Sequence, residues 1–329
     1  MANIQATSPK PTGWAHRLQH GDLFFWLLTL FFALVIIGLV VAVGVVTYNG
    51  SAEARAEYGT SFLTQSDWNP IETDLYQPSY GAWPAIRGTL LSSLIALLLA
   101  APTGIAIGIF LSELCPLRLR ALLGFTVELL AAIPSVIYGL WGVAVFSPWF
   151  TNAIANPLAT SIGQFIPWLA GPIAVSRGLA VTGVILAIMI LPTIAAITRD
   201  VLQAVPNHQR DVMLALGSTR WEVIWLSVLP YSRAGIIGGV MLGLGRALGE
   251  TMAATMLIGN STRIEESIFY PATTAAALVA SELPNSNSTM HESALIYLAL
   301  VLFGITLILN LAARYLVWQT SRGPAGARA

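Results

Sequence analysis

Three charged side chains lie inside stretches of this chain that are otherwise apolar enough to cross a membrane. Arg246 and Glu250 stand four residues apart in GGVMLGLGRALGETMAATMLIGN, and Glu128 lies in a separate apolar run. Residues four apart share one face of an α-helix, so we expect Arg246 and Glu250 to pair, with Glu128 within reach. The cluster either binds an anion through the planar donor fork of Arg246 or locks two helices together as a static ion pair.

A second polar feature follows Glu128 in the same apolar run. Pro134 lacks a backbone N–H and is expected to kink a helix there, next to Ser135, Tyr138 and Trp141. These groups either line a pathway through the membrane or pack the kink against a neighbouring helix.

The longest polar interval between two apolar runs, residues 199–235, has the pattern of a helix, a glycine turn and a second helix. Asp211 to Leu216 predicts a short helix that ends at Gly217. Ser218 is placed to cap the second helix, and Glu222 lies near its start. Such a loop offers a compact surface to a soluble partner.

The second of these helices carries an apolar knob. Trp221 and Trp225 lie four apart and share a face, with Val228 near them. The knob is suited either to docking on a partner protein or to lying in the headgroup region of a membrane.

The composition places the whole chain in the membrane. Of its 329 residues 56% are hydrophobic and only 10% are charged, and the mean hydropathy is +0.72, far from the composition of soluble domains. A formal net charge of zero argues against a nucleic-acid partner. Cys115 is the single cysteine, which excludes an intrachain disulfide and a zinc site built from thiolates.

Six apolar runs predict an all-α protein with six membrane spans. The expected spans are residues 23–47, 90–111, 121–146, 179–197, 236–258 and 294–317. The first run is too long for a signal-peptide core, so we expect an uncleaved helix after a polar tail, residues 1–22.

The segments between the spans divide into two sides. Residues 48–89 and 259–292 are expected to form outer loops. Residues 147–178 are interrupted by four prolines and are expected to form short interfacial helices at the outer surface. The loop 199–235 and the tail 318–329 are expected on the inside, and Pro116 should end the second span there.

The positions of lysine and arginine support this orientation, because cytoplasmic loops carry an excess of both. The segments assigned outside contain only Arg55, Arg87, Arg177 and Arg263. The segments assigned inside contain Lys10, Arg17, Arg118, Arg120, Arg199, Arg210, Arg220, Arg233, Arg314, Arg322 and Arg328. Both termini are therefore expected in the cytoplasm.

Several segments resemble a known family. DVMLALGSTRWEVIWLSVLPYSRAGI is similar to the EAA loop of ABC importer permeases, in which Gly217 and Leu229-Pro230 match, while Asp211-Val212-Met213 replaces the acidic-Ala-Ala triplet and Ser227 stands where Ile is usual. LSELCPLRLR, ELLAAIPSVIYGLWG and GLGRALGET resemble the phosphate-specific permeases. The extra first span and the long outer loop are similar to the PstC type rather than to its PstA partner. The resemblance covers roughly residue 89 to the C-terminus.

This resemblance implies a type I ABC importer permease with the MetI-like fold and an extra N-terminal helix, in the bacterial cytoplasmic membrane. It implies a heterodimer with a PstA-type permease, two copies of a PstB-type ATPase and a PstS-type phosphate-binding protein that meets the outer segments. ATP and Mg²⁺ would be used by the ATPase, and this chain, which lacks a GxxxxGK[ST] loop, would bind no cofactor or metal and have no catalytic residue.

The same resemblance assigns the candidate residues to two sites. The expected phosphate pathway comprises Arg246, Glu250, Glu128, Ser135 and Tyr138. The expected ATPase-coupling site comprises Asp211, Leu216, Gly217, Trp221, Glu222, Leu229 and Pro230.

Three alternatives to a phosphate permease remain open from the sequence. A permease for another oxyanion, such as sulfate or molybdate, would share the same loop. A proton-coupled secondary carrier would use Glu128 and Glu250 as a proton relay but would not need the docking loop. A membrane sensor would need an output domain, for which a chain made mostly of membrane helices leaves little room.

Overall fold

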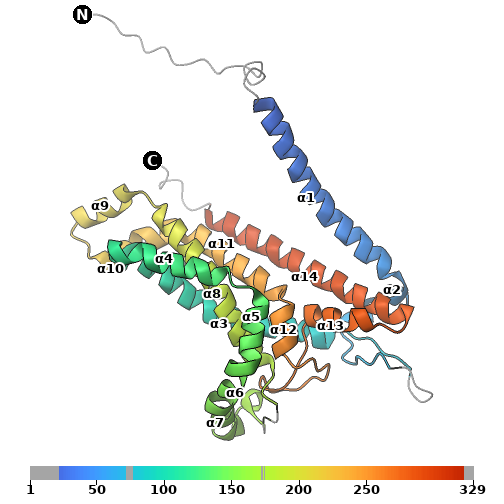
Figure 1. Cartoon of the computed structure of the whole chain (residues 1–329). Coiled ribbons are helices and arrows are strands. Elements are labelled where there is room, and N and C mark those ends of the chain that lie inside the picture. The colour runs from blue at the N-terminus through green and yellow to red at the C-terminus, as the bar shows by residue number, and fades with distance from the viewer. Residues whose placement is uncertain (1–21, 72–76, 172, 174, 322–329) are drawn as a thin grey trace, which may run out of the picture. The chain divides into compact units, whose positions relative to one another are not determined.

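The computed structural model describes residues 22–71, 77–171, 173 and 175–321, and these residues are overwhelmingly helical (Figure 1). Within these ranges the β-structure consists of two isolated β-bridges, Asn69 with Ser79 and Gly259 with Ala272. Five helices are long and apolar enough to cross a membrane, and a sixth crossing results if one sharply bent helix pair is counted as a span. The all-α membrane architecture expected from the sequence is confirmed.

The chain divides into two units, residues 1–49 and 50–329. The first contains nearly all of helix α1, Asp22–Gly50, whose apolar side chains are exposed along its length. An exposed helix of this hydropathy is matched to lipid. The expected tail, residues 1–22, lies outside the described residues except for Asp22.

The second unit is built on the pair α3, Trp83–Ile109, and α8, Leu179–Gln203. Small residues let the two helices approach closely, because a Cβ added to Gly104 would lie 3.0 Å from Ile194, and one added to Gly108 would lie 2.6 Å from Thr198. In the same way Gly183 of α8 lies against Ile95 of α3. The pair is therefore the rigid scaffold of this unit.

Both scaffold helices are longer than expected. Helix α3 begins at Trp83 and not at residue 90, so Arg87, which was expected in the outer loop, lies in its second turn. It continues through a π-helical turn, Phe110–Leu114, and ends before Pro116 as expected. Helix α8 extends past residue 197 to Gln203, so Arg199 is helical. Charged residues at helix ends lower the local hydropathy without ending the helix, which explains the shorter estimates.

The expected third span, residues 121–146, is instead a broken helix. Helix α4, Leu117–Ala131, ends before Pro134, and α5, Ser135–Trp141, starts a helical segment that leaves at 85° and runs to Thr160. Pro134 causes the break because its ring cannot donate a hydrogen bond to the preceding turn.

The prolines that follow do not divide the chain into short interfacial helices, as was expected for residues 147–178. Pro148 and Pro157 lie in α6, Ser147–Phe150, and α7, Asn156–Thr160, and each comes two residues after a π-helical turn. The wider π turn removes the clash between a proline ring and the carbonyl four residues earlier. The helix therefore continues to Thr160, and the chain is irregular only after it.

The polar loop is shorter than the expected 199–235. It contains α9, Asn207–Ala215, and ends where α10, Arg220–Val223, begins. A π-helical turn, again two residues before a proline, joins α10 to α11, Leu229–Leu248, so one helix runs from Arg220 to Leu248. The expected fifth span, 236–258, is interrupted, because α11 stops at Leu248 and α12, Met252–Leu257, follows.

The remaining elements are two short helices at the end of the unit that we expect to lie outside and one long helix that is apolar enough to cross the membrane. They are α2, Ala52–Tyr58, α13, Ala275–Glu282, and α14, Thr289–Ser321. The expected loop 259–292 therefore contains a helix, and α14 is longer at both ends than the expected span 294–317. The buried aromatic side chains Phe62, Trp68 and Tyr80 join these elements into a second core.

We predict that Gly108→Val destabilises the scaffold whereas Gly304→Val does not. A valine at 108 would press on the buried Thr198, at a cost of about 1–3 kcal/mol for overpacking. The same change in α14 meets nothing within 4 Å. Thermal unfolding of the two purified variants in detergent measures the difference, and equal melting temperatures would contradict the tight α3–α8 contact.

Candidate functional site

Two helix breaks lie at the same end of two packed helical segments. One break separates α4 from α5 at Pro134, and the other separates α11 from α12 at Gly249. A Cβ at Gly139 would meet Ala253 and Met256, and one at Gly142 would meet Leu257, so α5 and α12 run in the same direction (Figure 1). Broken helices at membrane depth expose backbone polar groups that can face a substrate.

Arg246 approaches these breaks from the last turn of α11. Its Nη1 donates to Thr193 Oγ1 of the scaffold helix α8 at 3.3 Å. The side chain is partly buried. Arg246 is thus held by one neutral hydroxyl, and most of its N–H donors have no protein partner within the described residues. This arrangement leaves the guanidinium able to bind an anion.

The expected Arg246–Glu250 ion pair is absent from the described structure, in which no carboxylate lies within 4.0 Å of Arg246. The four-residue spacing fails because α11 ends at Leu248 and Glu250 lies in the break. Glu250 Oε1 instead accepts a hydrogen bond from the Ala253 N–H at 3.2 Å. Its carboxylate therefore caps the first turn of α12, where the helix dipole favours negative charge.

Tyr138 spans the other break. Its hydroxyl donates to the Leu130 carbonyl at 2.9 Å, the carbonyl that Pro134 leaves without its usual helical donor. Tyr138 is 8% exposed. Ser135 is the first residue of α5 and lies beside this break. Sequence reasoning placed both residues at the kink, and the structure adds that Tyr138 satisfies the freed backbone.

Glu128 does not join the Arg246 cluster. Its Oε1 pairs with Arg199 Nη2 at 2.8 Å, and its side chain is 56% exposed. Arg199 lies six residues beyond Thr193 on α8, which is about 9 Å along the helix axis. Glu128 therefore lies well away from Arg246, toward the polar loop. The expectation failed because the break at Pro134 separates Glu128 from the segment that reaches α12.

The glycine turn of the polar loop forms as expected. Gly217 has φ +86°, and its N–H donates to the Leu214 carbonyl while the Ser218 N–H donates to Met213. This is a Schellman motif, which requires a residue that tolerates the left-handed conformation. Ser218 closes the first helix and does not cap the second. The cap is Thr219, which forms a reciprocal capping box with Glu222.

The apolar knob on this loop consists of two tryptophans. The rings of Trp221 and Trp225 meet edge to face with centroids 5.6 Å apart, and both are more than half exposed. Leu216 on the preceding turn is 78% exposed. Val228 was expected with them but is fully buried, because the π-helical turn before Pro230 rotates it inward.

The remaining coupling candidates differ in exposure. Asp211 is exposed on α9. Leu229 begins α11 and packs partly against a core that contains Val228, while Pro230 next to it is exposed. Leu229 thus anchors the exposed loop to the helix that carries Arg246.

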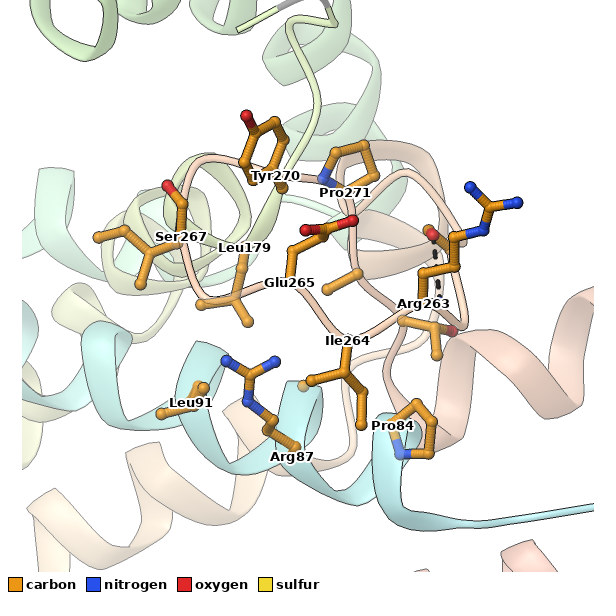
Figure 2. A pocket seen from close by; sticks show the side chains of 15 residues that line it. Pro84, Arg87, Leu91, Leu179, Arg263, Ile264, Glu265, Ser267, Tyr270 and Pro271 are labelled. Carbon is orange, nitrogen blue, oxygen red and sulfur yellow. Dashed lines mark hydrogen bonds between the residues drawn. The ribbon is translucent and has the colours of Figure 1, made fainter. Parts of the chain in front are cut away.

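On the opposite end of the unit, a pocket lies between α3 and the loop 261–273. Figure 2 shows Arg87 rising from α3 toward Glu265, whereas Arg263 points away from them. Gly88 beside Arg87 is needed here, because a Cβ would lie against the Thr273 carbonyl. The loop is therefore fixed on the end of α3.

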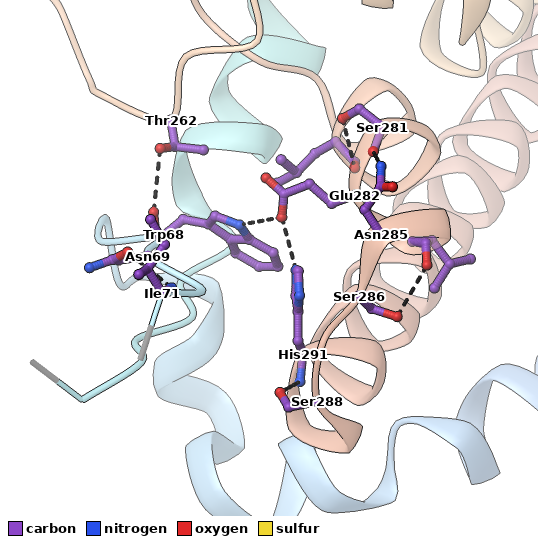
Figure 3. Close-up of polar contacts among 12 residues, drawn as sticks. Trp68, Asn69, Ile71, Thr262, Ser281, Glu282, Asn285, Ser286, Ser288 and His291 are labelled. Atoms are coloured by element: carbon purple, nitrogen blue, oxygen red, sulfur yellow. Dashed lines mark hydrogen bonds and ion pairs between the residues drawn. The ribbon is translucent and has the colours of Figure 1, made fainter. Parts of the chain in front are cut away.

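A polar network joins the two outer segments, 48–89 and 259–292 (Figure 3). Glu282 Oε2 accepts from Trp68 Nε1 at 2.9 Å and lies 3.0 Å from His291 Nε2. His291 is buried and stacks on Tyr80. The two segments therefore present one preassembled surface and not two independent loops.

Sequence reasoning missed several of these contacts. Thr193 gave no signal beyond a hydroxyl after Pro192 in an apolar run. Arg210 was counted only as a cytoplasmic charge, yet it forms a bidentate pair with Glu113. Both partners were visible in the sequence, but their distance along the chain hid the pairing.

Comparison with known proteins identifies the family of this chain. Residues 104–321 match the family described as "Binding-protein-dependent transport system inner membrane component". The chain is 45% identical to the phosphate transport system permease protein PstC of Mesorhizobium japonicum, over 92% of each protein. It is 43% identical to that of Pasteurella multocida, over 93% of this chain and 95% of the relative.

A solved structure shares the fold. A chain from the crystal structure of a bacterial alginate ABC transporter in complex with an alginate pentasaccharide-bound periplasmic protein superposes with a TM-score of 0.58. The identity is 15%, and the match covers 94% of this chain and 98% of that one. The likeness therefore concerns the fold alone.

We predict that charge removal at Arg246 and Glu250 affects stability additively. The two side chains have different partners, Thr193 and the α12 backbone, so the free energies of unfolding lost in Arg246→Gln and Glu250→Gln should sum in the double variant to within about 0.5 kcal/mol. Thermal unfolding of the three variants measures this. A double variant more stable than either single variant would show that the two charges pair.

Proposed function

We infer, from the fact that this chain belongs to the PstC family of phosphate transport system permeases, that it carries phosphate across the bacterial inner membrane. It is the transmembrane permease subunit of an ATP-driven importer, a multi-pass membrane protein and not itself an enzyme. The observation that carries this function is the close match to PstC proteins over nearly the whole chain. The geometry at the helix breaks supplies the mechanism that we propose below.

Arg246 is proposed to bind phosphate in transit. Its planar donor fork matches an oxyanion, and Thr193 holds it at only one point. Backbone groups at the two neighbouring breaks are proposed to complete the site, and Tyr138 stabilises one of these breaks by donating to the Leu130 carbonyl. The site is proposed to attract an anion because no carboxylate pairs with Arg246. A single arginine binds the anion weakly enough that the anion can leave again.

Glu250 is proposed to keep this site weak and in place. As the cap of α12 it fixes the break beside Arg246, and its negative charge opposes tight trapping of a phosphate dianion. Ser135, at the start of α5, is proposed to line the same region. Glu128 is not included, because it pairs with Arg199.

The polar loop is proposed to dock the ATPase. The edge-to-face pair Trp221 and Trp225, with Leu216, forms an exposed apolar surface of the kind that fits a protein groove. The helix that starts at Arg220 continues without interruption to Leu248, next to the break. A movement imposed on the loop would therefore reach Arg246 directly.

The assembly that we propose contains a PstA-type permease, two PstB-type ATPases and a PstS-type phosphate-binding protein. The binding protein would meet the surface joined by Trp68, Glu282 and His291. ATP and Mg²⁺ would bind to the ATPases. Both termini would lie in the cytoplasm, as the distribution of lysine and arginine indicates.

Uptake of labelled phosphate into vesicles tests this function. Vesicles that hold this chain with its partner permease and ATPase should accumulate phosphate only when ATP and binding protein are present, and should not accumulate sulfate. Uptake of sulfate in place of phosphate would assign the chain to another oxyanion. Uptake driven by a proton gradient without ATP would assign it to the secondary carriers.

We predict that Arg246→Gln abolishes phosphate uptake and that the double variant Arg246→Gln/Glu250→Gln stays inactive. The loss follows from removal of the anion-binding fork, which Arg246→Lys should restore only in part because an ammonium lacks the bidentate geometry. Arg233→Gln is the matched control, since Arg233 lies on the same helix but donates to the Thr320 carbonyl. Recovery of uptake in the double variant would make the charges architectural.

We predict that Gly217→Leu and Trp221→Ala release the ATPase on co-purification. A leucine at φ +86° is strained by about 1–2 kcal/mol although the space around Gly217 is open. Gly217→Asn is the control, because asparagine tolerates this conformation, and it should retain the ATPase. Full retention in both test variants would remove the loop as the docking site.

A further inference from the structure

We propose that Arg210 and Glu113 form a joint that couples α9 rigidly to the ends of α3 and α8, so that ATPase movements reach the scaffold through this ion pair. The inference rests on the proposed docking of the ATPase on the polar loop. It adds a second route, separate from the continuous helix that leads from Arg220 to Arg246.

Arg210 uses every N–H donor of its guanidinium. Nε and Nη2 donate to the two carboxylate oxygens of Glu113 at 3.1 and 2.7 Å. Nη2 also donates to the Leu202 carbonyl at 2.8 Å, and Nη1 donates to the Val205 carbonyl at 2.6 Å and to Asn207 Oδ1 at 3.4 Å. An arginine has five N–H donors, so the set of partners is complete.

These partners belong to three elements. Glu113 lies in the π-helical turn that ends α3, Leu202 lies in the last turn of α8, and Asn207 is the first residue of α9. The joint therefore fixes the α8–α9 corner and fastens it to α3. Its geometry is a planar fork on a carboxylate, which sets an orientation as well as a distance.

Burial makes this ion pair firmer than the others near the loop. The side chains of Arg210 and Glu113 are 18% and 11% exposed, whereas the carboxylate of Asp200, which pairs with Arg199, is 62% exposed. Exposed pairs are screened by solvent and contribute little. A buried pair resists separation, because each charge would be left without a partner.

Apart from the joint, α9 is held by Met213, which packs against the core that contains Leu202, Val223 and Val228, and by the Gln209 carbonyl, which accepts a hydrogen bond from Ser227 Oγ at 3.4 Å. No residue of α9 is buried. On its far side α9 meets the Gly217 turn, which has open space around it, before α10 begins. A force that the ATPase applies to the exposed Leu216 at the end of α9 is therefore passed by Arg210 to α3 and α8.

The test uses the complete complex with partner permease, ATPase and binding protein in proteoliposomes, with ATP hydrolysis and phosphate uptake measured together. Glu113→Gln and Arg210→Lys keep the size of the side chain but remove the charge or the fork. We expect both variants to assemble and hydrolyse ATP but to transport about tenfold fewer phosphate ions per ATP. The control Asp200→Asn breaks the exposed pair and should transport normally. Unchanged coupling in assembled test variants would overturn the joint.

A second measurement decides the question if those variants fail to assemble. Spin labels at Leu114 and Val212, in a wild-type joint with Cys115 replaced by serine, report the distance from α3 to α9. Labels at Val212 and Leu226 report the distance across Gly217. We expect the first distance to stay constant through the ATP cycle and the second to change. A change in the first distance would overturn the joint, whereas absent phosphate uptake by the wild type would overturn only the proposed function.

Discussion

A helix that breaks inside a bilayer leaves backbone N–H and C=O groups where water does not reach them, and each such group must find another partner. The candidate site of this protein depends on two such breaks. Tyr138 donates to the Leu130 carbonyl at one, and Glu250 accepts from the Ala253 N–H at the other. Thr251 also donates from its hydroxyl to the Gly249 carbonyl. Because these side chains satisfy the backbone, the breaks are stable features that can hold a charged group.

The α3–α8 scaffold is held together by close packing and not by hydrogen bonds to freed backbone groups. Glycines at 104, 108 and 183 bring α3 and α8 into close contact, since packing and not a hydrophobic force drives helix association in lipid. The scaffold also supplies Thr193, the hydroxyl that positions Arg246. The rigid α3–α8 pair thus makes one contact with a charged side chain of α11, and movement of α11 relative to α8 would alter the proposed anion site.

The arginines near the candidate site and those near the polar loop differ in their partners. Arg246 has no carboxylate partner within the described residues and can serve a ligand. Near the polar loop, by contrast, two arginines are paired with carboxylates, Arg210 with the buried Glu113 and Arg199 with the exposed Glu128. An arginine that is fully paired supports structure, and one that is held by a single hydroxyl is available for recognition.

The sequence by itself determined the class of the protein and the approximate spans, and it singled out the candidate site residues. The length of the apolar runs indicates membrane helices, and Gly217 indicates a left-handed turn. Arg246 is a candidate functional residue because a charge within an apolar run is rare. Only the tertiary structure decided which of these residues meet. Helical spacing paired Arg246 with Glu250, but a break between them gave each another partner, and Pro134 directed Glu128 toward Arg199. Prolines 148, 157 and 230 looked alike in the sequence and were accommodated by π-helical turns, whereas Pro134 broke its helix. The outcome depended on whether neighbouring side chains could satisfy the freed backbone, and contacts such as Tyr138 with Leu130 exist only once the chain has folded.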